Sequence, residues 1–288
     1  MASSALAGRG RPARRGFQQA PSGAAGPGAP GTTSPAPTAL AQTATPQAPA
    51  PPTGVAAPLI HGIEIGSGIG SYDNGLGHAN DQSVRYRLSK ANDFGLTLDM
   101  GRERRFGETS INGGWSFSKS LAGGTTVNAG WGTGSGQVLA PSYRFDVGVT
   151  RPIGGALANV GYTRVQSKAE NASNGIGAGV VQYFTQWIVG GNVRVDVGSP
   201  GRTVSTSAGL NATWYQWKKT YIGGGLSWGD VSYTLLLQGG LVNYRAYGAN
   251  ASVSRWLSDS AGVNVGVSYG HTPLYQVSGI RVSVFRDF

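Results

Sequence analysis

The sequence predicts an all-β fold: an antiparallel up-and-down transmembrane β-barrel of about 14 strands, with twelve to sixteen as the range. Three observations carry this prediction. Apolar and polar residues alternate with a period of two from about residue 59 to the end, and the alternating segments are roughly 9–15 residues long. The connections between successive segments alternate between short and longer ones. A tilted strand of about 9–11 residues crosses a bilayer, whereas strands in soluble proteins average about five or six residues.

The composition fits a barrel with a wet interior. The 288 residues include 48 Gly and no Cys, 12% are charged and 39% are hydrophobic, and both fractions lie below the average for soluble domains. Half of each barrel strand faces a polar lumen, which accounts for a chain poor in both kinds of residue. No run approaches the roughly 18 apolar residues of a transmembrane helix. The lack of cysteine excludes disulfides and thiolate-bound metals, and we predict no cofactor.

Residues 1–57 are predicted to form a disordered tail or linker ahead of a barrel domain of residues 58–288. They hold ten of the 15 Pro and are mostly Ala, Pro, Gly, Ser and Thr, so they have too little apolar surface to offset the entropy of ordering. Their four Arg occur with no acid. A short basic block without aromatics is usually a solvated tail, so we predict no nucleic acid partner. We also see no apolar run typical of an ordinary signal peptide in this stretch.

Each alternating segment of the barrel domain is expected to form one strand. The segments are bounded by Gly, Asn, Asp, Ser or Pro, the residues that favour turns. In order they read IHGIEIGSGIGSY, QSVRYRLSK, FGLTLDMGRERRF, TSINGGWSFSK, TTVNAGWGTG, SYRFDVGVTRPI, ALANVGYTRVQS, NGIGAGVVQYF, WIVGGNVRVDV, VSTSAGLNATWYQ, YIGGGLSWG, NYRAYGANASVSRWL, AGVNVGVSYGH and QVSGIRVSVFRDF.

The connections between these segments differ in length according to parity. Those after even-numbered segments are short, such as SLAGG, WKKT and SDS. Those after odd-numbered segments include longer pieces, such as DNGLGHAND, SGQVLAP and a connection of about a dozen residues around Val231–Val242, although GE after Phe106 is short. Outer-membrane barrels have short periplasmic turns and long outer loops, so we expect both ends of the barrel domain on the periplasmic side.

Large aromatic residues gather beside the short turns, which is the expected place for an aromatic girdle at the periplasmic membrane interface. A soluble core would instead spread them along the strands. The predicted girdle consists of Trp115, Phe117, Tyr183, Phe184, Trp187, Trp214, Trp217 and Trp256.

The alternation also assigns charged residues to the lumen. In SYRFDVGVTRPI, the side chains of Tyr143, Phe145, Val147 and Val149 share one face, and those of Arg144 and Asp146 the other. In a membrane barrel the apolar face meets lipid and the charged face lines the lumen. The same rule gives a mixed-sign set of lumen-facing charges: Arg85, Arg87, Asp99, Glu103, Arg105, Arg144, Asp146, Arg194 and Asp196. Such a set either tunes a transport path or fills the interior with ion pairs that hold the wall.

Several pieces, in their order and spacing, resemble the YaiO-type outer-membrane β-barrel family of Gram-negative bacteria over most of residues 60–288: GRERRFGETSINGGWSFS, LAPSYRFDVGVTRPIGG and VVQYFTQWIVGGNVRV. The resemblance implies a place in the outer membrane, contact with its lipid and with the barrel-assembly machinery, and a loose link to exopolysaccharide and its export proteins. It also implies that the C-terminal strand carries the assembly signal of such barrels, formed by Ile280, Val282, Val284 and Phe288.

We therefore expect a porin-like, non-enzymatic envelope protein that acts as a conduit or a scaffold. One alternative is an outer-membrane hydrolase that modifies lipids, for which His78 and His271 would lie near the outer loops. Neither has a neighbouring motif that fixes a nucleophile, and no pair of histidines has the spacing of metal ligands. A second alternative is a secreted β-sandwich adhesin, which would need shorter strands and a core shared by two sheets.

Overall fold

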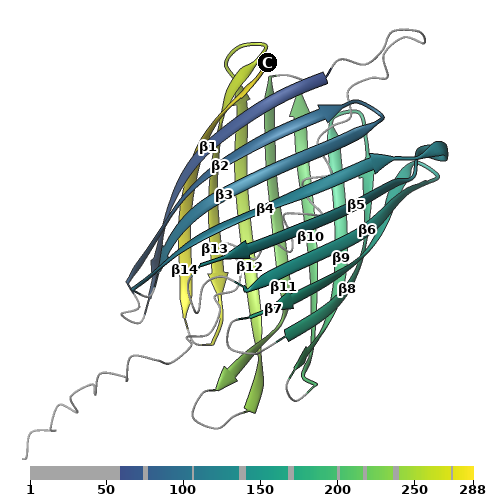
Figure 1. Ribbon diagram of the computed structural model, residues 1–288. Coiled ribbons are helices and arrows are strands. Elements are labelled where there is room, and N and C mark those ends of the chain that lie inside the picture. The colour runs from purple at the N-terminus through teal and green to yellow at the C-terminus, as the bar shows by residue number, and fades with distance from the viewer. Residues whose placement is uncertain are drawn as a thin grey trace, which may run out of the picture.

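The computed structural model describes residues 59–73, 77–105, 107–135, 141–167, 172–199, 202–216, 219–235, 240–273 and 275–288, without the side chains of 231–235 and 240–243. Within them, fourteen strands form one sheet (Figure 1). Their bounds are β1 Leu59–Tyr72, β2 His78–Lys90, β3 Phe94–Arg105, β4 Glu108–Ser120, β5 Thr126–Gly134, β6 Tyr143–Ile153, β7 Ala156–Gln166, β8 Ala172–Tyr183, β9 Trp187–Ser199, β10 Val204–Gln216, β11 Thr220–Leu235, β12 Gly240–Trp256, β13 Ala261–His271 and β14 Gln276–Asp287.

The sheet is a closed antiparallel barrel, because β1 pairs with β2 on one side and with β14 on the other. The closing register runs from Gly62 opposite Asp287 to Tyr72 opposite Val277. Every other strand pairs with its neighbours in sequence, as an up-and-down topology requires. The predicted all-β barrel of about 14 strands is therefore confirmed. The expected tail, residues 1–57, lies outside the described residues.

The outer face of the wall is apolar. Side chains such as Ile65, Met100 and Ile176 are 52–65% exposed, which in water would be costly at about 25 cal/mol per Å². A strand of twelve residues rises about 40 Å along its axis and, tilted by about 45°, about 28 Å along the membrane normal, close to the roughly 25 Å apolar band of such barrels. The wall thus has the height and the surface of a membrane-spanning barrel. Among the described residues, no helix is long and apolar enough to cross a membrane.

The turns at the end that carries Leu59 and Phe288 are short. A single 3-10 turn, Ala122–Gly124, joins β4 to β5, and Gly154, with φ +61°, opens the two-residue turn between β6 and β7. At this φ a side chain is strained and Gly is favoured. At the opposite end, the predicted long connection around Val231–Val242 is wrong in extent, because β11 continues to Leu235 and β12 begins at Gly240. The strands pair through this region.

The turn between β2 and β3 is held by an ionic contact. The carboxylate of Asp93 accepts a hydrogen bond from Lys119 of β4 and lies 3.3 Å from the ammonium of Lys90. Lys119 first, and Lys90 second, lower the pKa of Asp93 below its ordinary value of 3.8. Short-turn ends of this kind face the periplasm, so Asp93 is exposed to the pH of the solution on that side of the membrane.

Asp93→Asn is expected to destabilise the barrel at neutral pH and to have no effect in strong acid. A lowered pKa in the folded state contributes stability that is present above the unfolded value and is lost as the pH falls through the folded value. Urea unfolding in detergent micelles at neutral pH and below the lowered pKa measures this difference. A gap between the variant and the native chain that stays constant with pH would contradict the assignment.

Candidate functional site

The inner face of the barrel is identified by side chains that reach past a neighbouring strand. Arg194 of β9 donates a 3.2 Å hydrogen bond to Thr163 of β7, and Arg281 of β14 contacts Asp81 of β2. Each contact skips the strand in between. Side chains two strands apart converge only on the concave side of a curved sheet, so these residues point into the barrel. Polar side chains on the inner face form two separate groups.

The first group, the β6–β9 cluster, consists of Arg144, Asp146, Thr163, Ser173, Arg194 and Asp196. Arg144 binds Asp146 through two hydrogen bonds, Nε to Oδ2 at 2.6 Å and Nη2 to Oδ1 at 2.7 Å. Arg194 donates two hydrogen bonds to Asp196 in the same way, each 2.6 Å long. Thr163 joins the pairs, since its hydroxyl donates to Asp146 at 2.6 Å and accepts from Arg194. Bidentate Arg–carboxylate contacts are stronger and more directional than ion pairs with a single hydrogen bond.

A glycine makes room for the second of these pairs. A Cβ atom placed on Gly175 of β8 would overlap both Asp196 Oδ1 and the Arg194 guanidinium. Two residues along the same face, a Cβ on Gly177 would meet the carbonyl oxygen of Val193 only at 3.5 Å. Gly175 is thus the position at which the ion pair lies against the backbone of the neighbouring strand.

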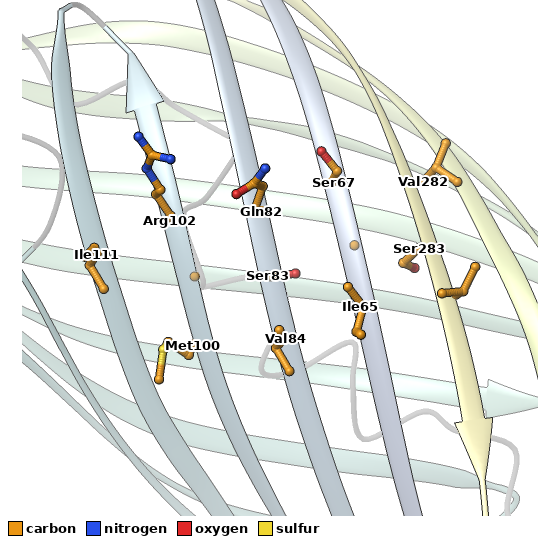
Figure 2. Close-up of a pocket in the computed structure, with 13 residues that line it drawn as sticks. Ile65, Ser67, Gln82, Ser83, Val84, Met100, Arg102, Ile111, Val282 and Ser283 are labelled. Carbon is orange, nitrogen blue, oxygen red and sulfur yellow. The ribbon is translucent and has the colours of Figure 1, made fainter.

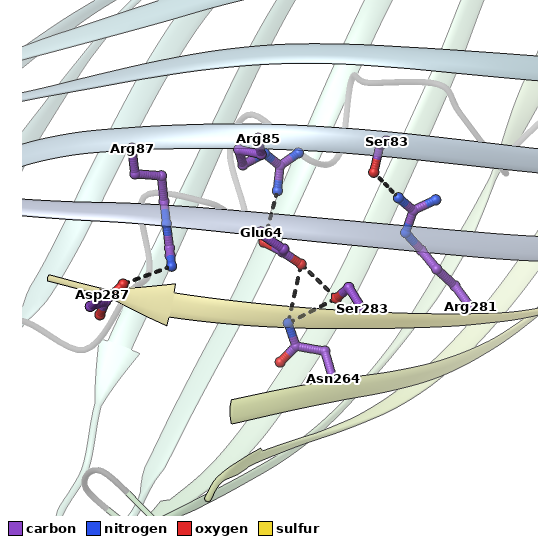
Figure 3. A network of polar contacts seen from close by, with 8 residues as sticks. All are labelled: Glu64, Ser83, Arg85, Arg87, Asn264, Arg281, Ser283 and Asp287. Atoms are coloured by element: carbon purple, nitrogen blue, oxygen red, sulfur yellow. Dashed lines mark hydrogen bonds and ion pairs between the residues drawn. The ribbon is translucent and has the colours of Figure 1, made fainter. Parts of the chain in front are cut away.

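The second group, the seam cluster, lies where the first and last strands meet (Figure 3). It consists of Glu64, Asp81, Ser83, Arg85, Arg87, Asn264, Arg281, Ser283 and Asp287. Glu64 accepts hydrogen bonds from Ser283 at 2.7 Å and from Asn264 at 3.1 Å, and lies 3.8 Å from Arg85. Arg87 reaches Asp287 at 3.4 Å. Arg281 binds both Asp81 and Ser83.

A hollow of about 240 Å³ on the inner wall lies beside the seam cluster, between β3 and β12. Asp81, Glu103, Arg281, Asn250 and Ser268 contribute to its lining. Glu103 also pairs with Arg105 at 2.9 Å, and both side chains are almost fully buried. The hollow therefore carries charges of both signs beside apolar residues such as Val277.

The sequence-predicted lumen charges divide between these groups. Arg144, Asp146, Arg194 and Asp196 form the β6–β9 cluster, Arg85 and Arg87 belong to the seam cluster, and Glu103 and Arg105 lie beside it. Asp99 joins neither; it lies next to Gly114, whose Cβ would come within 3.1 Å of Asp99 Oδ2. A role for these charges in transport or in holding the wall stays a prediction.

Sequence reasoning missed most of the seam cluster, including four of its six charged residues. Glu64, Asp81, Arg281 and Asp287 were not among the predicted lumen charges, although the same two-residue alternation places them on the inner face. Their partners lie about 200 residues away in the chain. The signal was present in the alternation of the first and last segments, but the pairing depends on barrel closure.

The predicted aromatic girdle is distributed more widely than expected. Phe184 and Trp187 are exposed at the short turn between β8 and β9, and Trp214 donates a 3.4 Å hydrogen bond to Gln186 of the same turn. Tyr183 ends β8. Trp115 lies in the middle of β4, in a row with Trp131 of β5, and Phe117 follows it toward the turn. Trp217 lies outside the described residues.

Trp256 does not belong to the predicted girdle. Its ring packs edge-on against Phe285 at a centroid distance of 4.8 Å, and Phe285 is buried on the inner face. Trp256 was assigned to the girdle because it adjoins a short turn, whereas the two-residue alternation along β12 turns it inward. It closes the inner side of the short-turn end instead of contacting lipid.

The residues of the predicted assembly signal share the outer face of β14. Ile280, Val282, Val284 and Phe288 are all exposed. Phe288 stacks on the ring of His61 at 5.9 Å, and the backbones of these two residues exchange hydrogen bonds of 2.8 and 3.1 Å. Recognition of this strand by an assembly machinery stays a prediction.

The histidines of the hydrolase alternative do not meet. His78 begins β2 and His271 ends β13, and neither makes a side-chain hydrogen bond to a described Ser or acid. No group of three or more His, Asp or Glu side chains in the described ranges could hold a metal ion.

Comparison with solved structures places this fold among known barrels. The chain is similar to the structure of the CymD monoaromatic hydrocarbon channel, with a TM-score of 0.54, 10% identity, and coverage of 81% of this chain and 88% of that one. A bacterial polysaccharide outer membrane secretin gives a TM-score of 0.50 at 8% identity, with coverage of 79% and 98%. OmpT of Vibrio cholerae gives 0.50 at 6%, with coverage of 81% and 98%. At such identities the likeness concerns the fold alone.

No curated protein matches the sequence. Residues 60–234, more than half of the chain, match the YaiO membrane beta barrel domain. The family resemblance noted in the sequence is thereby confirmed, and with it the outer-membrane location. By this match and by its closed barrel, the chain belongs to the YaiO family of membrane β-barrels.

Proposed function

We propose that this outer-membrane barrel is a non-enzymatic conduit for hydrated polar solutes, with glycan chains, as in exopolysaccharide export, as the cargo class. The observation that carries the proposal is the character of the inner face. Its side chains are mostly small and polar, and many inner positions are Gly whose missing side chains lie beside Asn, Ser or Thr of the next strand, as at Gly148, Gly179, Gly209, Gly225 and Gly279. An interior so lined leaves space for solute and offers amide and hydroxyl groups to sugar hydroxyls.

The distribution of charge supports a neutral, hydrophilic cargo. Most described lumen charges are held in ion pairs within the β6–β9 cluster, the seam cluster or the Glu103–Arg105 pair. The opposite charges of each pair nearly cancel at a distance, so the pairs do not strongly favour either anionic or cationic solutes. A barrel of similar fold is described as a polysaccharide secretin, which agrees with this cargo class.

Replacing both Arg144 and Arg194 by Gln is expected to shift the channel toward cation selectivity in planar bilayers. The change leaves Asp146 and Asp196 uncompensated inside the lumen. The shift should be large at 0.1 M salt, where charges act over about 10 Å, and small at 1 M, where they act over about 3 Å. Reversal potentials at the two salt concentrations measure it.

Arg151→Gln is the control, because it makes the same kind of substitution at an exposed position of β6 on the apolar face. It should leave selectivity unchanged. Neutral oligosaccharides added to the native channel should interrupt the current. Absence of conductance from a folded, heat-modifiable native barrel would contradict the conduit.

A scaffold is the second candidate, favoured by the same ion pairing. In that case the clusters hold the wall and nothing passes. A scaffold predicts no conductance together with loss of the folded barrel when Asp146 or Asp196 loses its partner. Hydrolysis of lipid by the purified protein, abolished by His78→Ala or His271→Ala, would overturn both candidates in favour of an enzyme.

A further inference from the structure

The outer face carries a shallow, mostly apolar groove with a row of polar side chains toward one end (Figure 2). It has a volume of about 640 Å³ and crosses five neighbouring strands, β14, β1, β2, β3 and β4. Side chains on the outer face form its rims, and small inner-face residues, including Gly66, Ser83 and Gly101, form its floor.

Two rows of outward-facing residues define the two ends of the groove. The register aligns Ser67, Gln82 and Arg102 side by side on β1, β2 and β3. The next outward row toward the short-turn end aligns Ile65, Val84 and Met100 on the same strands. In Figure 2, Arg102, Gln82 and Ser67 lie toward one end of the groove, with the apolar side chain of Val282 beside Ser67, whereas Met100, Val84 and Ile65 lie toward the other end. The polar end points toward the long-loop end of the barrel, which in outer-membrane barrels is the external side.

The polar end is basic and has no acid to balance it. Arg104 lies one outward position beyond Arg102 on β3, and both side chains are exposed. Neither forms an ion pair or a hydrogen bond with any residue that the structure describes. The nearby acids lie on the other face. Asp81 of β2 and Glu103 of β3 itself point to the inner face and are paired there, and Glu108 of β4 lies opposite Arg105, which is also on the inner face.

Arginine on the lipid-facing surface of a barrel normally costs free energy, and this cost becomes small near the interface. Arg102 is three residues from the external end of β3, at the depth where lipid headgroups begin. Two guanidinium groups at that depth can bind a phosphate in forked geometry. Below them, an acyl chain can lie on Met100, Val84 and Ile65.

We propose that this groove is a binding site for a phosphorylated glycolipid of the outer leaflet, the lipid A part of lipopolysaccharide. Arg102 and Arg104 bind its phosphate, Gln82 and Ser67 bind sugar hydroxyls, and the apolar row holds an acyl chain. The charge of the polar end, its orientation to the external side and the outer-membrane location agree with this occupant. The site is on the opposite side of the wall from the proposed conduit and does not depend on it.

The test measures binding of lipid A to the purified full-length barrel by native mass spectrometry in detergent. The double variant Arg102→Gln, Arg104→Gln is expected to bind lipid A about ten-fold more weakly than the native chain, since it loses charge-assisted contacts to phosphate. Arg151→Gln is the matched control; it also removes an exposed charge from the apolar face, but near the short-turn end. It should bind lipid A as the native chain does.

Two further probes separate headgroup from tail. Dephosphorylated lipid A should bind to the native chain no better than phosphorylated lipid A binds to the double variant. Phosphatidylglycerol, which has a phosphate but no sugar backbone, should bind more weakly than lipid A. Equal lipid A binding by the native chain, the double variant and Arg151→Gln would overturn the proposal. Equal binding of phosphatidylglycerol and lipid A would overturn it too, by assigning the groove to phospholipid in general.

Discussion

Val147→Arg is expected to destabilise the folded barrel by about 2–4 kcal/mol, the cost of an arginine on the lipid side at the middle of the membrane. Val147 lies at the centre of β6, is exposed on the outer face, and is flanked across the strands by Ala129 and Tyr162. Neither neighbour offers a counter-charge. Unfolding in urea from lipid vesicles, followed by tryptophan fluorescence, measures the loss.

Thr150→Arg is the matched control for this prediction. Thr150 lies three residues farther along the same strand, on the inner face, between Thr126 and Asn159. An arginine there reaches the wet lumen, so the free energy of unfolding should change by less than about 1 kcal/mol. Equal destabilisation by the two variants would mean that the inner and outer faces of β6 are wrongly assigned.

Asp146→Ala is expected to lower the free energy of unfolding by roughly 2–3 kcal/mol, because it leaves a mostly buried arginine without its counter-charge. The side chain of Arg144 is 10% exposed and that of Asp146 is 20% exposed. Asp146 also accepts the hydrogen bond of Thr163, so its removal leaves both Arg144 and Thr163 without this acceptor. Urea unfolding of the single variant and of the double variant Arg144→Met, Asp146→Ala measures the coupling.

The double variant should recover part of the loss, since removing both partners leaves no uncompensated charge. Asp230→Ala provides the comparison on the outer face. The Asp230 carboxylate is 4.0 Å from Arg245, whose side chain is 72% exposed, and exposed ion pairs contribute about 0–1 kcal/mol. If Asp146→Ala costs no more than Asp230→Ala, the β6–β9 cluster does not hold the wall.

The fold followed from the sequence because alternation, segment length and turn parity all depend on local order. Arg144 and Asp146 illustrate the favourable case: they occur two residues apart on one strand, so the same alternation that puts both on the inner face also puts them in contact. Arg281 and Asp81 illustrate the opposite case. Each has an unambiguous face, but their contact exists only once β14 lies beside β1, which a reading of separate segments does not reveal.

The prediction that Trp256 belongs to the girdle was wrong for a different reason. Proximity to a turn fixes the depth of a residue in the membrane, but its face depends on counting alternate positions back along the strand. At the end of β12 this count gives the inner face, where Phe285 covers the indole. The lipid-facing groove was also hidden from the sequence, because Ser67, Gln82 and Arg102 become neighbours only through the register of three strands.

The seam cluster has a consequence for the kinetics of folding and unfolding. Arg87–Asp287 and Arg281–Asp81 join residues about 200 positions apart, and contacts of such long range form late because loop closure must precede them. Until then β1 and β14 have free backbone edges, which are costly in lipid. Interactions formed after the transition state mainly slow unfolding. The ion pairs of the seam cluster therefore stabilise the closed barrel after the transition state for folding. Their strength affects the rate at which the barrel opens more than the rate at which its sheet assembles.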